Sequence, residues 1–594
     1  NRNPAALASN RLMLVVVDNS FSMRAGKRLD DAKDAAMNVI AGKGAVRAQV
    51  ASFGSQLRLL TQPVEDQSVL RAAVQAIQPG DSHGNFGELA RAVRAMAESS
   101  RVPIEFHLIS DMQRADLAGN FSDMALPANV KLVTYAVVSR AEPNWTVESV
   151  DAPGQVWGRD AKPIHAQAVI AGFGTPAAQR IVSLVVNGKT TATKTIAVPA
   201  NGRATVDFPA LVVPYGFSQC EVKIDHADSL PGDDLRRFAV ERSDPKRALF
   251  IHNYGDSRSS FYVGAALSAA AQSAFILESI NVNEAADRKP SNYSFVILSD
   301  VNSVPPLLEN SLTGYVRSGG SVMLTAGTSA GARSQIPIFG EHITATRDYS
   351  RVPGRFMTVG SADSSFAAVA KADGWSGVKF FYALDVDPGD ARVIVRLSDQ
   401  TPLLMEKRIG EGRVLLLTSG LDNLTNDFPL DPAFVPFVEQ TARYLSGTER
   451  QGGSRTVDAY LELRNAKERG QGVEVTDPEG KRPLSLSEAA SAQSIQLTEA
   501  GYYQLRLANG RQDEVGVNPD PKESVLDVIP EDLLSLWRGE SSEEAAPAHQ
   551  TGSAAGERKV PQTLWWYVML LVLISAVAES VLASRYLGTQ REEL

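Results

Sequence analysis

Three oxygen-bearing side chains stand at alternate positions directly after an apolar run near the start of the chain. Residues 12–17 (LMLVVV) are uninterrupted apolar sequence, which predicts a strand buried on both faces, as in a parallel sheet. Asp18, Ser20 and Ser22 follow this run. Carboxylate and hydroxyl oxygens are hard ligands, and open α/β sheets bind ligands at the carboxyl ends of their strands. We therefore predict a divalent-cation site here rather than an acid–base site, because no histidine lies nearby in the sequence.

A helix is expected directly after this loop. Apolar side chains recur at helical spacing in residues 29–40. The unit is thus a strand, an oxygen-rich loop and a helix. The alternative interpretation is that Asp18, Ser20 and Ser22 merely cap the helix, as such residues often do.

The pentapeptide 18–22 (DNSFS) resembles the D-x-S-x-S adhesion motif of the von Willebrand factor A domain. That family adds a threonine from a second loop and an aspartate after a later strand. Asp111, which follows the apolar residues of 106–110, matches the aspartate. The resemblance implies a doubly wound α/β domain that binds Mg²⁺, with Mn²⁺ or Ca²⁺ as alternatives.

The second loop departs from the family pattern G-T-[DN]-L. Residues 83–86 (HGNF) match it, so that Gly84 stands where the family has threonine. Ser82 or Asn85 would then substitute, directly or through water. The metal ligands implied by the resemblance are Asp18, Ser20, Ser22, Asp111 and Ser82.

Length and composition exclude several functional classes. At 594 residues the chain is too long for one core, and about three to five domains are expected. A formal net charge of −9 argues against nonspecific nucleic-acid binding. Cys220 is the single cysteine, so internal disulfides and cysteine-based metal clusters are excluded. The histidines show no metal-binding or catalytic spacing.

The pattern of apolar residues changes along the chain and predicts a multidomain protein of α/β and all-β parts. Strands alternating with helices indicate doubly wound sheets, whereas short strands separated by Gly, Pro and Asn indicate a sandwich. The predicted domains are a von Willebrand A-like domain (1–140), an immunoglobulin-like β-sandwich (141–243), a second α/β domain (244–447) and a small β-domain (448–520).

The C-terminal part predicts a membrane anchor. Residues 521–562 include acidic, Ala-, Ser- and Gly-rich sequence and are expected to be a flexible linker. Residues 563–585 are long and apolar enough for a transmembrane helix in contact with lipid, with Trp565 and Trp566 as interfacial anchors. Residues 586–594 form a short tail.

The second α/β domain resembles the class I glutamine amidotransferase-like fold. Residues 327–331 (GTSAG) fall at the nucleophile elbow of that family, with Ser329 in place of cysteine, and also fit the G-x-S-x-G elbow of serine hydrolases. Pro337 breaks the helix that should follow, and His342 is the only later histidine of the domain. We expect a catalytically degenerate domain, and a hydrolase acting through Ser329 is the alternative.

The order of these parts resembles bacterial membrane proteins of the BatA type. The resemblance includes residues 229–234 (SLPGDD) and 426–430 (NDFPL). It implies a non-enzymatic interaction or scaffold protein of the bacterial inner membrane, with periplasmic domains and partners among other membrane or MoxR-system proteins in stress tolerance. The A domain would bind such partners through a cation completed by a partner carboxylate. A structural protein with a decayed metal loop is the milder alternative.

Overall fold

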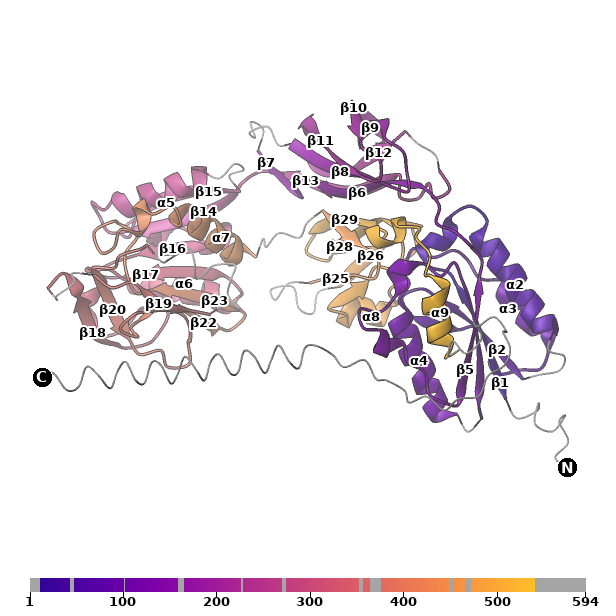
Figure 1. Cartoon of the computed structure of the whole chain (residues 1–594). Helices are drawn as coiled ribbons and strands as arrows, with labels where there is room; N and C mark the ends of the chain where they lie inside the picture. Colours follow the sequence, from indigo (N-terminus) through magenta and orange to yellow (C-terminus); the bar gives the residue numbers. More distant parts are fainter. Residues whose placement is uncertain are drawn as a thin grey trace, which may run out of the picture. The chain divides into compact units, whose positions relative to one another are not determined.

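The computed structural model describes residues 11–42, 47–100, 102–158, 165–225, 228–269, 274–351, 356–363, 375, 377–447, 453–464 and 472–539. Figure 1 shows the successive α/β and all-β regions that these residues form.

A five-stranded, largely parallel sheet forms the centre of the N-terminal domain. Its strands are β1 (Leu12–Asp18), β2 (Ala48–Phe53), β3 (Leu57–Leu59), β4 (Ile104–Ser110) and β5 (Val130–Ala136). They lie in the order β3-β2-β1-β4-β5, and only β3 runs antiparallel to its neighbour. The carboxyl ends of β1 and β4 therefore lie side by side.

Helices cover both faces of this sheet, as the sequence predicts (Figure 1). They are α2 (Arg28–Gly42), α3 (Gln67–Gln75), α4 (Phe86–Ser99) and, from far along the chain, α9 (Glu531–Arg538). Val15 and Val17 pack in one core with α2 and α3, whereas Leu14 and Val16 pack in the other with α4 and α9. Strand β1 is apolar throughout because alternate residues enter opposite cores.

The described residues between 144 and 243 form a β-sandwich of two sheets, with strand orders β10-β9-β12-β13-β7 and β11-β8-β6. The strands are β6 (Asn144–Asp151), β7 (Gln155–Trp157), β8 (His165–Phe173), β9 (Ala178–Val186), β10 (Lys189–Val198), β11 (Arg203–Ala210), β12 (Gly216–Ile224) and β13 (Leu235–Ser243). Apolar residues of both sheets share one core, and Cys220 is buried in it.

The second α/β domain is built on an eight-stranded mixed sheet, ordered β15-β14-β16-β17-β23-β22-β21-β19. The strands of the domain are β14 (Lys246–His252), β15 (Phe275–Asn281), β16 (Val296–Ser299), β17 (Ser321–Thr325), β18 (Ile343–Asp348), β19 (Val359–Ala362), β20 (Tyr382–Val386), β21 (Arg392–Leu397), β22 (Pro402–Ile409) and β23 (Gly412–Leu417). Helices α5 (Arg258–Ala269) and α7 (Phe434–Ser446) pack in one core, and α6 (Pro306–Arg317) in another.

The described residues of 453–518 form a small β-domain. Its main sheet has the order β24-β29-β28-β26, and β25 pairs with β27. The elements are β24 (Ser454–Thr456), β25 (Tyr460–Glu462), β26 (Val473–Thr476), α8 (Leu486–Ser491), β27 (Ser494–Gln496), β28 (Gly501–Leu507) and β29 (Gln512–Asn518).

Residues 521–539 correct the expectation of a flexible linker that begins at residue 521. They form the 3-10 helix η12 (Pro521–Ser524) and helix α9, which pack on the N-terminal domain. Leu534 and Trp537 are buried there, and the Trp537 indole N–H donates to the Met124 carbonyl at 2.8 Å. The segment is ordered because its spaced apolar residues complete the core on the α4 side of the sheet.

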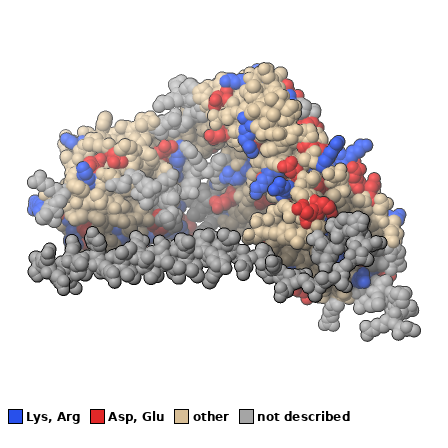
Figure 2. All heavy atoms as spheres, viewed as in Figure 1, with Lys and Arg blue, Asp and Glu red and all other residues tan. Residues whose placement is uncertain are grey.

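The predicted remainder of the linker, the transmembrane helix 563–585 and the tail 586–594 lie outside the described residues. Within the described ranges, the helices are too short or too polar to cross a membrane. On the face drawn in Figure 2, acidic and basic side chains of the described residues are interspersed.

Candidate metal centre

The loop after β1 buries Asp18, Ser20 and Ser22 completely. Asp18 Oδ1 accepts a hydrogen bond from the Ser20 backbone N–H at 2.8 Å, and the Ser20 and Ser22 hydroxyl oxygens lie 3.2 Å apart. Ser20 precedes the 3-10 helix η1 (Phe21–Arg24), but its side chain makes no capping hydrogen bond. The loop therefore gathers the three side chains toward one another instead of using Ser20 as a cap.

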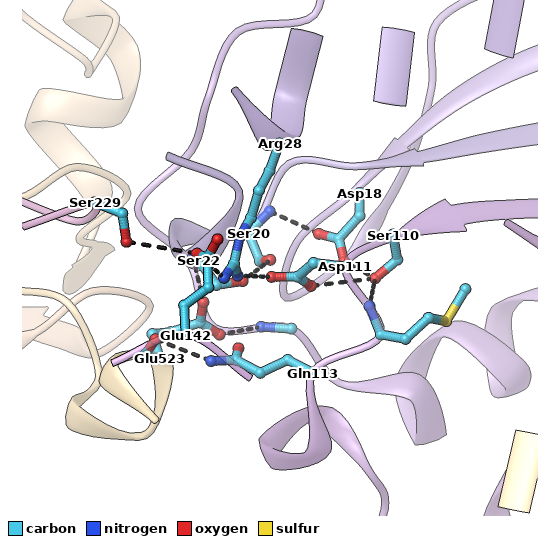
Figure 3. Close-up of polar contacts among 12 residues, drawn as sticks. Asp18, Ser20, Ser22, Arg28, Ser110, Asp111, Gln113, Glu142, Ser229 and Glu523 are labelled. Atoms are coloured by element: carbon cyan, nitrogen blue, oxygen red, sulfur yellow. Dashed lines mark hydrogen bonds and ion pairs between the residues drawn. The ribbon is translucent and has the colours of Figure 1, made fainter. Parts of the chain in front are cut away.

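The end of β4 brings a second carboxylate to this loop. Because β1 and β4 are adjacent parallel strands, Val17 pairs with Ile109, and Ser110 and Asp111 follow beside Asp18. The Ser110 hydroxyl donates to Asp18 Oδ2 at 2.6 Å. Figure 3 shows Asp18 and Asp111 directed toward the same space, with Ser20 and Ser22 next to them. The structure thus brings together four of the five predicted ligands.

Ser82, the fifth predicted ligand, uses its side chain elsewhere. Its hydroxyl donates to Asp458 Oδ1 at 3.5 Å. Asn85, the other candidate substitute, caps α4 by accepting hydrogen bonds from the backbone N–H groups of Gly87 and Glu88.

Asp116 occupies the space beside Gly84 that a threonine side chain would need. A Cβ atom at position 84 would lie 2.5 Å from Asp116 Oδ2. Asp116 is 1% exposed, and neither carboxylate oxygen has a hydrogen-bond partner. Ligand oxygens of Asp18, Asp111 and Asp116 all lie within 4.8 Å of one another. No spacing rule marks Asp116 in the sequence, because it enters the site from the 3-10 turn η2 (Arg114–Asp116).

Glu523 adds a further buried carboxylate from the C-terminal segment. Its Oε2 accepts a hydrogen bond from the Ser22 backbone N–H at 2.7 Å, and its Oε1 accepts one from the Gly84 backbone N–H at 2.9 Å. His83 Nδ1 lies 2.7 Å from Oε1. Sequence reasoning missed Glu523 because it placed this residue in the linker.

Negative charge exceeds positive charge in this buried site. Burial raises the pKa of Asp18 to about 7, and the charge of Asp111 adds to the effect. Burial also raises the pKa of Asp116 well above its usual value, with further contributions from the charges of Glu523, Asp18 and Asp111. The pKa of Asp111 is raised by burial although the guanidinium of Arg28 lowers it.

Two basic side chains of the described residues contact the carboxylates of this site. His83 Nδ1 lies 3.7 Å from Asp116 Oδ1 and 2.7 Å from Glu523 Oε1, and the other is Arg28. Its Nη1 lies 2.6 Å from Asp111 Oδ2 and its Nη2 lies 2.7 Å from Glu142 Oε2, so its charge is shared between two carboxylates (Figure 3). The site therefore combines hydroxyl oxygens, carboxylate oxygens of which those of Asp116 accept no hydrogen bond, and more acidic than basic side chains. This donor set fits a hard divalent cation such as Mg²⁺, Mn²⁺ or Ca²⁺.

Ser329 lies in a different setting. It follows β17, but only the three-residue 3-10 helix η6 (Ala330–Ala332) comes after it, where a nucleophile elbow needs a helix. Its backbone N–H donates to Asp300 Oδ2 at 3.0 Å. No hydrogen bond joins Ser329 to a histidine in the described part of the chain, and His342 is exposed. These features give the hydrolase hypothesis no support.

Comparison with known proteins identifies the N-terminal domain. Residues 13–113 match the von Willebrand factor type A domain. This chain contains a von Willebrand factor type A (VWA) domain. Both Asp18 and Asp111 lie within the matched residues. No curated protein matches the chain. The expected likeness of residues 244–447 to amidotransferases stays a prediction.

Parts of three solved structures are similar to parts of this chain. BatB from Bacteroides thetaiotaomicron is 14% identical, with 21% of this chain and 64% of that chain covered and a TM-score of 0.18. An aerotolerance-related membrane protein from Bacteroides fragilis is 16% identical, with 21% and 65% covered and a TM-score of 0.18. The von Willebrand factor domain of the type V pili tip protein Mfa5 from Porphyromonas gingivalis is 24% identical, with 18% and 39% covered and a TM-score of 0.16.

Proposed function

We propose that this chain is a non-enzymatic interaction or scaffold protein whose VWA domain binds a protein partner through a divalent cation. The match of residues 13–113 to the VWA family supports the interaction role. The observation that carries the cation is the carboxylate of Asp116, which accepts no hydrogen bond and is buried beside Asp18 and Asp111, with His83 Nδ1 3.7 Å from its Oδ1. A buried carboxylate that accepts no hydrogen bond is costly, and a divalent cation would offset that cost.

The ligand set in this proposal differs from the sequence prediction in one residue. The side chains that would hold the cation are Asp18, Ser20, Ser22, Asp111 and Asp116. Asp116 takes the part that the family gives to the threonine, because Gly84 leaves room for its carboxylate. Mg²⁺ is the first candidate, with Mn²⁺ and Ca²⁺ as alternatives. The bound cation supplies a positive centre that an acidic side chain can bind.

The cellular setting of this proposal rests on the sequence. Residues 563–585 would anchor the chain in the bacterial inner membrane, with the folded domains on the periplasmic side. The partners would be other membrane proteins or components of a Bat/MoxR-like stress-tolerance system.

Calorimetric titration of the 594-residue chain in detergent with Mg²⁺ and Mn²⁺ tests the cation site. We expect saturable binding, weakened by about tenfold or more in Asp116→Asn because one charged ligand is lost. Asp34→Asn is the matched control, because Asp34 is an exposed carboxylate on α2. Absence of binding to the unmodified chain, or equal binding by Asp116→Asn, contradicts the proposed ligand set.

A further inference from the structure

The carboxylate of Glu523 reaches both of the loops that carry the adhesion motif. It is completely buried, and its bonds to the backbone N–H groups of Ser22 and Gly84 span the first and second loops. A carboxylate has about four lone-pair sites, and the two backbone bonds and the His83 contact engage three of them. Glu523 therefore keeps capacity for one more positive group.

That remaining capacity lies beside the candidate cation site. Ligand atoms of Glu523, Asp116 and His83 all lie within 4.8 Å of one another, and Asp116 also belongs to the group with Asp18 and Asp111. Asp116 thus connects Glu523 to the motif. Both carboxylates are buried, and like charges this close repel each other unless one is protonated or a positive group lies beside them. His83 contacts both carboxylates, and a divalent cation would offset their charge further.

The segment that carries Glu523 is held against the third loop of the site as well. Gln113 lies two residues after Asp111, and its side-chain amide donates to the carbonyl oxygens of Glu523 at 3.0 Å and Val525 at 2.7 Å. Gln113 also forms an antiparallel bridge with Val528. The segment therefore covers all three loops around the site with its own backbone and one acidic side chain, as an acidic partner peptide would.

The β-sandwich and an apolar contact hold the same segment. The side-chain amide of Asn144 donates to the Ser524 carbonyl at 2.9 Å. Leu526 is buried in a cluster with Phe21 and Ala25 of the motif loop and with Leu230 of the sandwich. Helix α9 anchors the segment on one side and β29 on the other. Release of residues 519–529 as a loop would therefore expose the site without detaching the chain.

We propose that Glu523 is an internal ligand of the VWA domain: it completes the cation site in the absence of a partner, and a partner with an acidic side chain must displace residues 519–529 to bind. This inference rests on the proposed cation-dependent function. In this proposal Glu523 of the same chain occupies the position of a partner's acidic side chain. Cation binding therefore holds residues 519–529 against the site instead of creating an open adhesion face.

Hydrogen–deuterium exchange of the 594-residue chain in detergent tests the first half of the proposal. We expect Mn²⁺ to slow exchange of residues 519–529 by about tenfold or more relative to EDTA, a change that Glu523→Gln abolishes. Asp527→Asn is the matched control, because Asp527 is an exposed carboxylate in the same segment. If calorimetry shows Mn²⁺ binding but exchange is the same with and without Mn²⁺, the internal ligand is excluded and the proposed function survives. If Mn²⁺ does not bind at all, both fail.

A labelled peptide of residues 518–530 tests the second half. It carries the acidic side chain and the flanking contacts of the internal segment, and it must compete with a tethered copy. In the presence of Mn²⁺ we expect the peptide to bind the Glu523→Gln chain at least about tenfold more tightly than the unmodified chain. Equal binding to the two chains, or binding that EDTA leaves unchanged, overturns the displacement mechanism.

Discussion

Gly84 and Asp116 fit together only because residue 84 has no side chain. A Cβ atom on residue 84 would lie 2.5 Å from Asp116 Oδ2, which is closer than van der Waals contact allows. The glycine that departs from the VWA pattern and the carboxylate beside it therefore form one arrangement. From the sequence alone, Gly84 lacks the side-chain oxygen of the family's threonine; in the structure, it leaves room for the carboxylate of Asp116.

This relationship predicts coupled substitutions. We expect Gly84→Thr to destabilise the VWA domain by about 1–3 kcal/mol, because the added side chain overlaps the Asp116 carboxylate. The double variant Gly84→Thr/Asp116→Ala should recover most of that loss, because the overlapping atoms are gone. Urea unfolding in EDTA measures both effects. Gly42→Ala, at an open position on α2, is the control. Equal destabilisation of the single and double variants would show that the two residues are not coupled.

Arg28 compensates buried negative charge, and the loss of stability on its removal should depend on whether the divalent cation is bound. In EDTA we expect Arg28→Gln to destabilise the chain by about 3–5 kcal/mol, because Asp111 loses its buried partner at 2.6 Å. The loss should be smaller in Mg²⁺, because a bound cation offsets the same negative charge. Urea unfolding in the two conditions checks this. Arg91→Gln, which removes an exposed ion pair with Glu88, should change stability by about 0.5 kcal/mol or less. An equal loss in EDTA and Mg²⁺ contradicts the prediction.

Helix α9 should contribute to the stability of the VWA domain. Trp537 is 7% exposed and contacts Phe86, with ring centroids 5.2 Å apart. We expect Trp537→Ala to cost about 3–5 kcal/mol and to speed hydrogen exchange in α4. Leu536→Ala on the exposed side of the same helix should cost about 0.5 kcal/mol or less. If both substitutions have the same small effect, α9 is not part of the core.

The raised pKa values of Asp233 and Asp234 lead us to expect that the free energy of unfolding falls as the pH rises. Burial raises the pKa of Asp233 to about 7, and burial with the charges of Asp228 and Asp233 raises that of Asp234 to about 8, opposed by Arg180. At any pH between the ordinary pKa of an aspartate and the raised pKa values of Asp233 and Asp234, the folded chain therefore binds more protons than the unfolded chain. Stability is highest below that window and decreases through it, by about 1.4 kcal/mol per pH unit for each group that titrates.

Urea unfolding between about pH 5 and about pH 8.5 tests this prediction, because this range covers the window in which the two groups titrate. Asp234→Asn should flatten the decline and stabilise the chain at the alkaline end, because the amide needs no proton. Asp207→Asn, at an exposed position of β11, should leave the slope unchanged. A slope that is the same in all three chains contradicts the assignment to Asp234.

The β1 loop shows how much local pattern can determine. Continuous apolar residues can form strand β1 only if both faces are covered, and the residue that ends the run is then at the carboxyl edge of the sheet. The alternation of Asp18, Ser20 and Ser22 and the neighbouring strand that ends before Asp111 are therefore enough to predict where four side chains meet. Helical spacing likewise predicts α2, because its buried face depends on residues a few positions apart.

Asp116, Glu523 and the order of residues 521–539 were decided only by the tertiary structure. Glu523 and Ser22 are 501 residues apart, and no spacing rule relates them. Their contact depends on the chain returning to the VWA domain after the small β-domain. Leu534 and Trp537 stand in otherwise polar sequence, and their burial needs a complementary surface that other parts of the chain build. The sequence by itself determined that the loop after β1 resembles the VWA motif, and the long-range return of the chain decided that Glu523 lies against it.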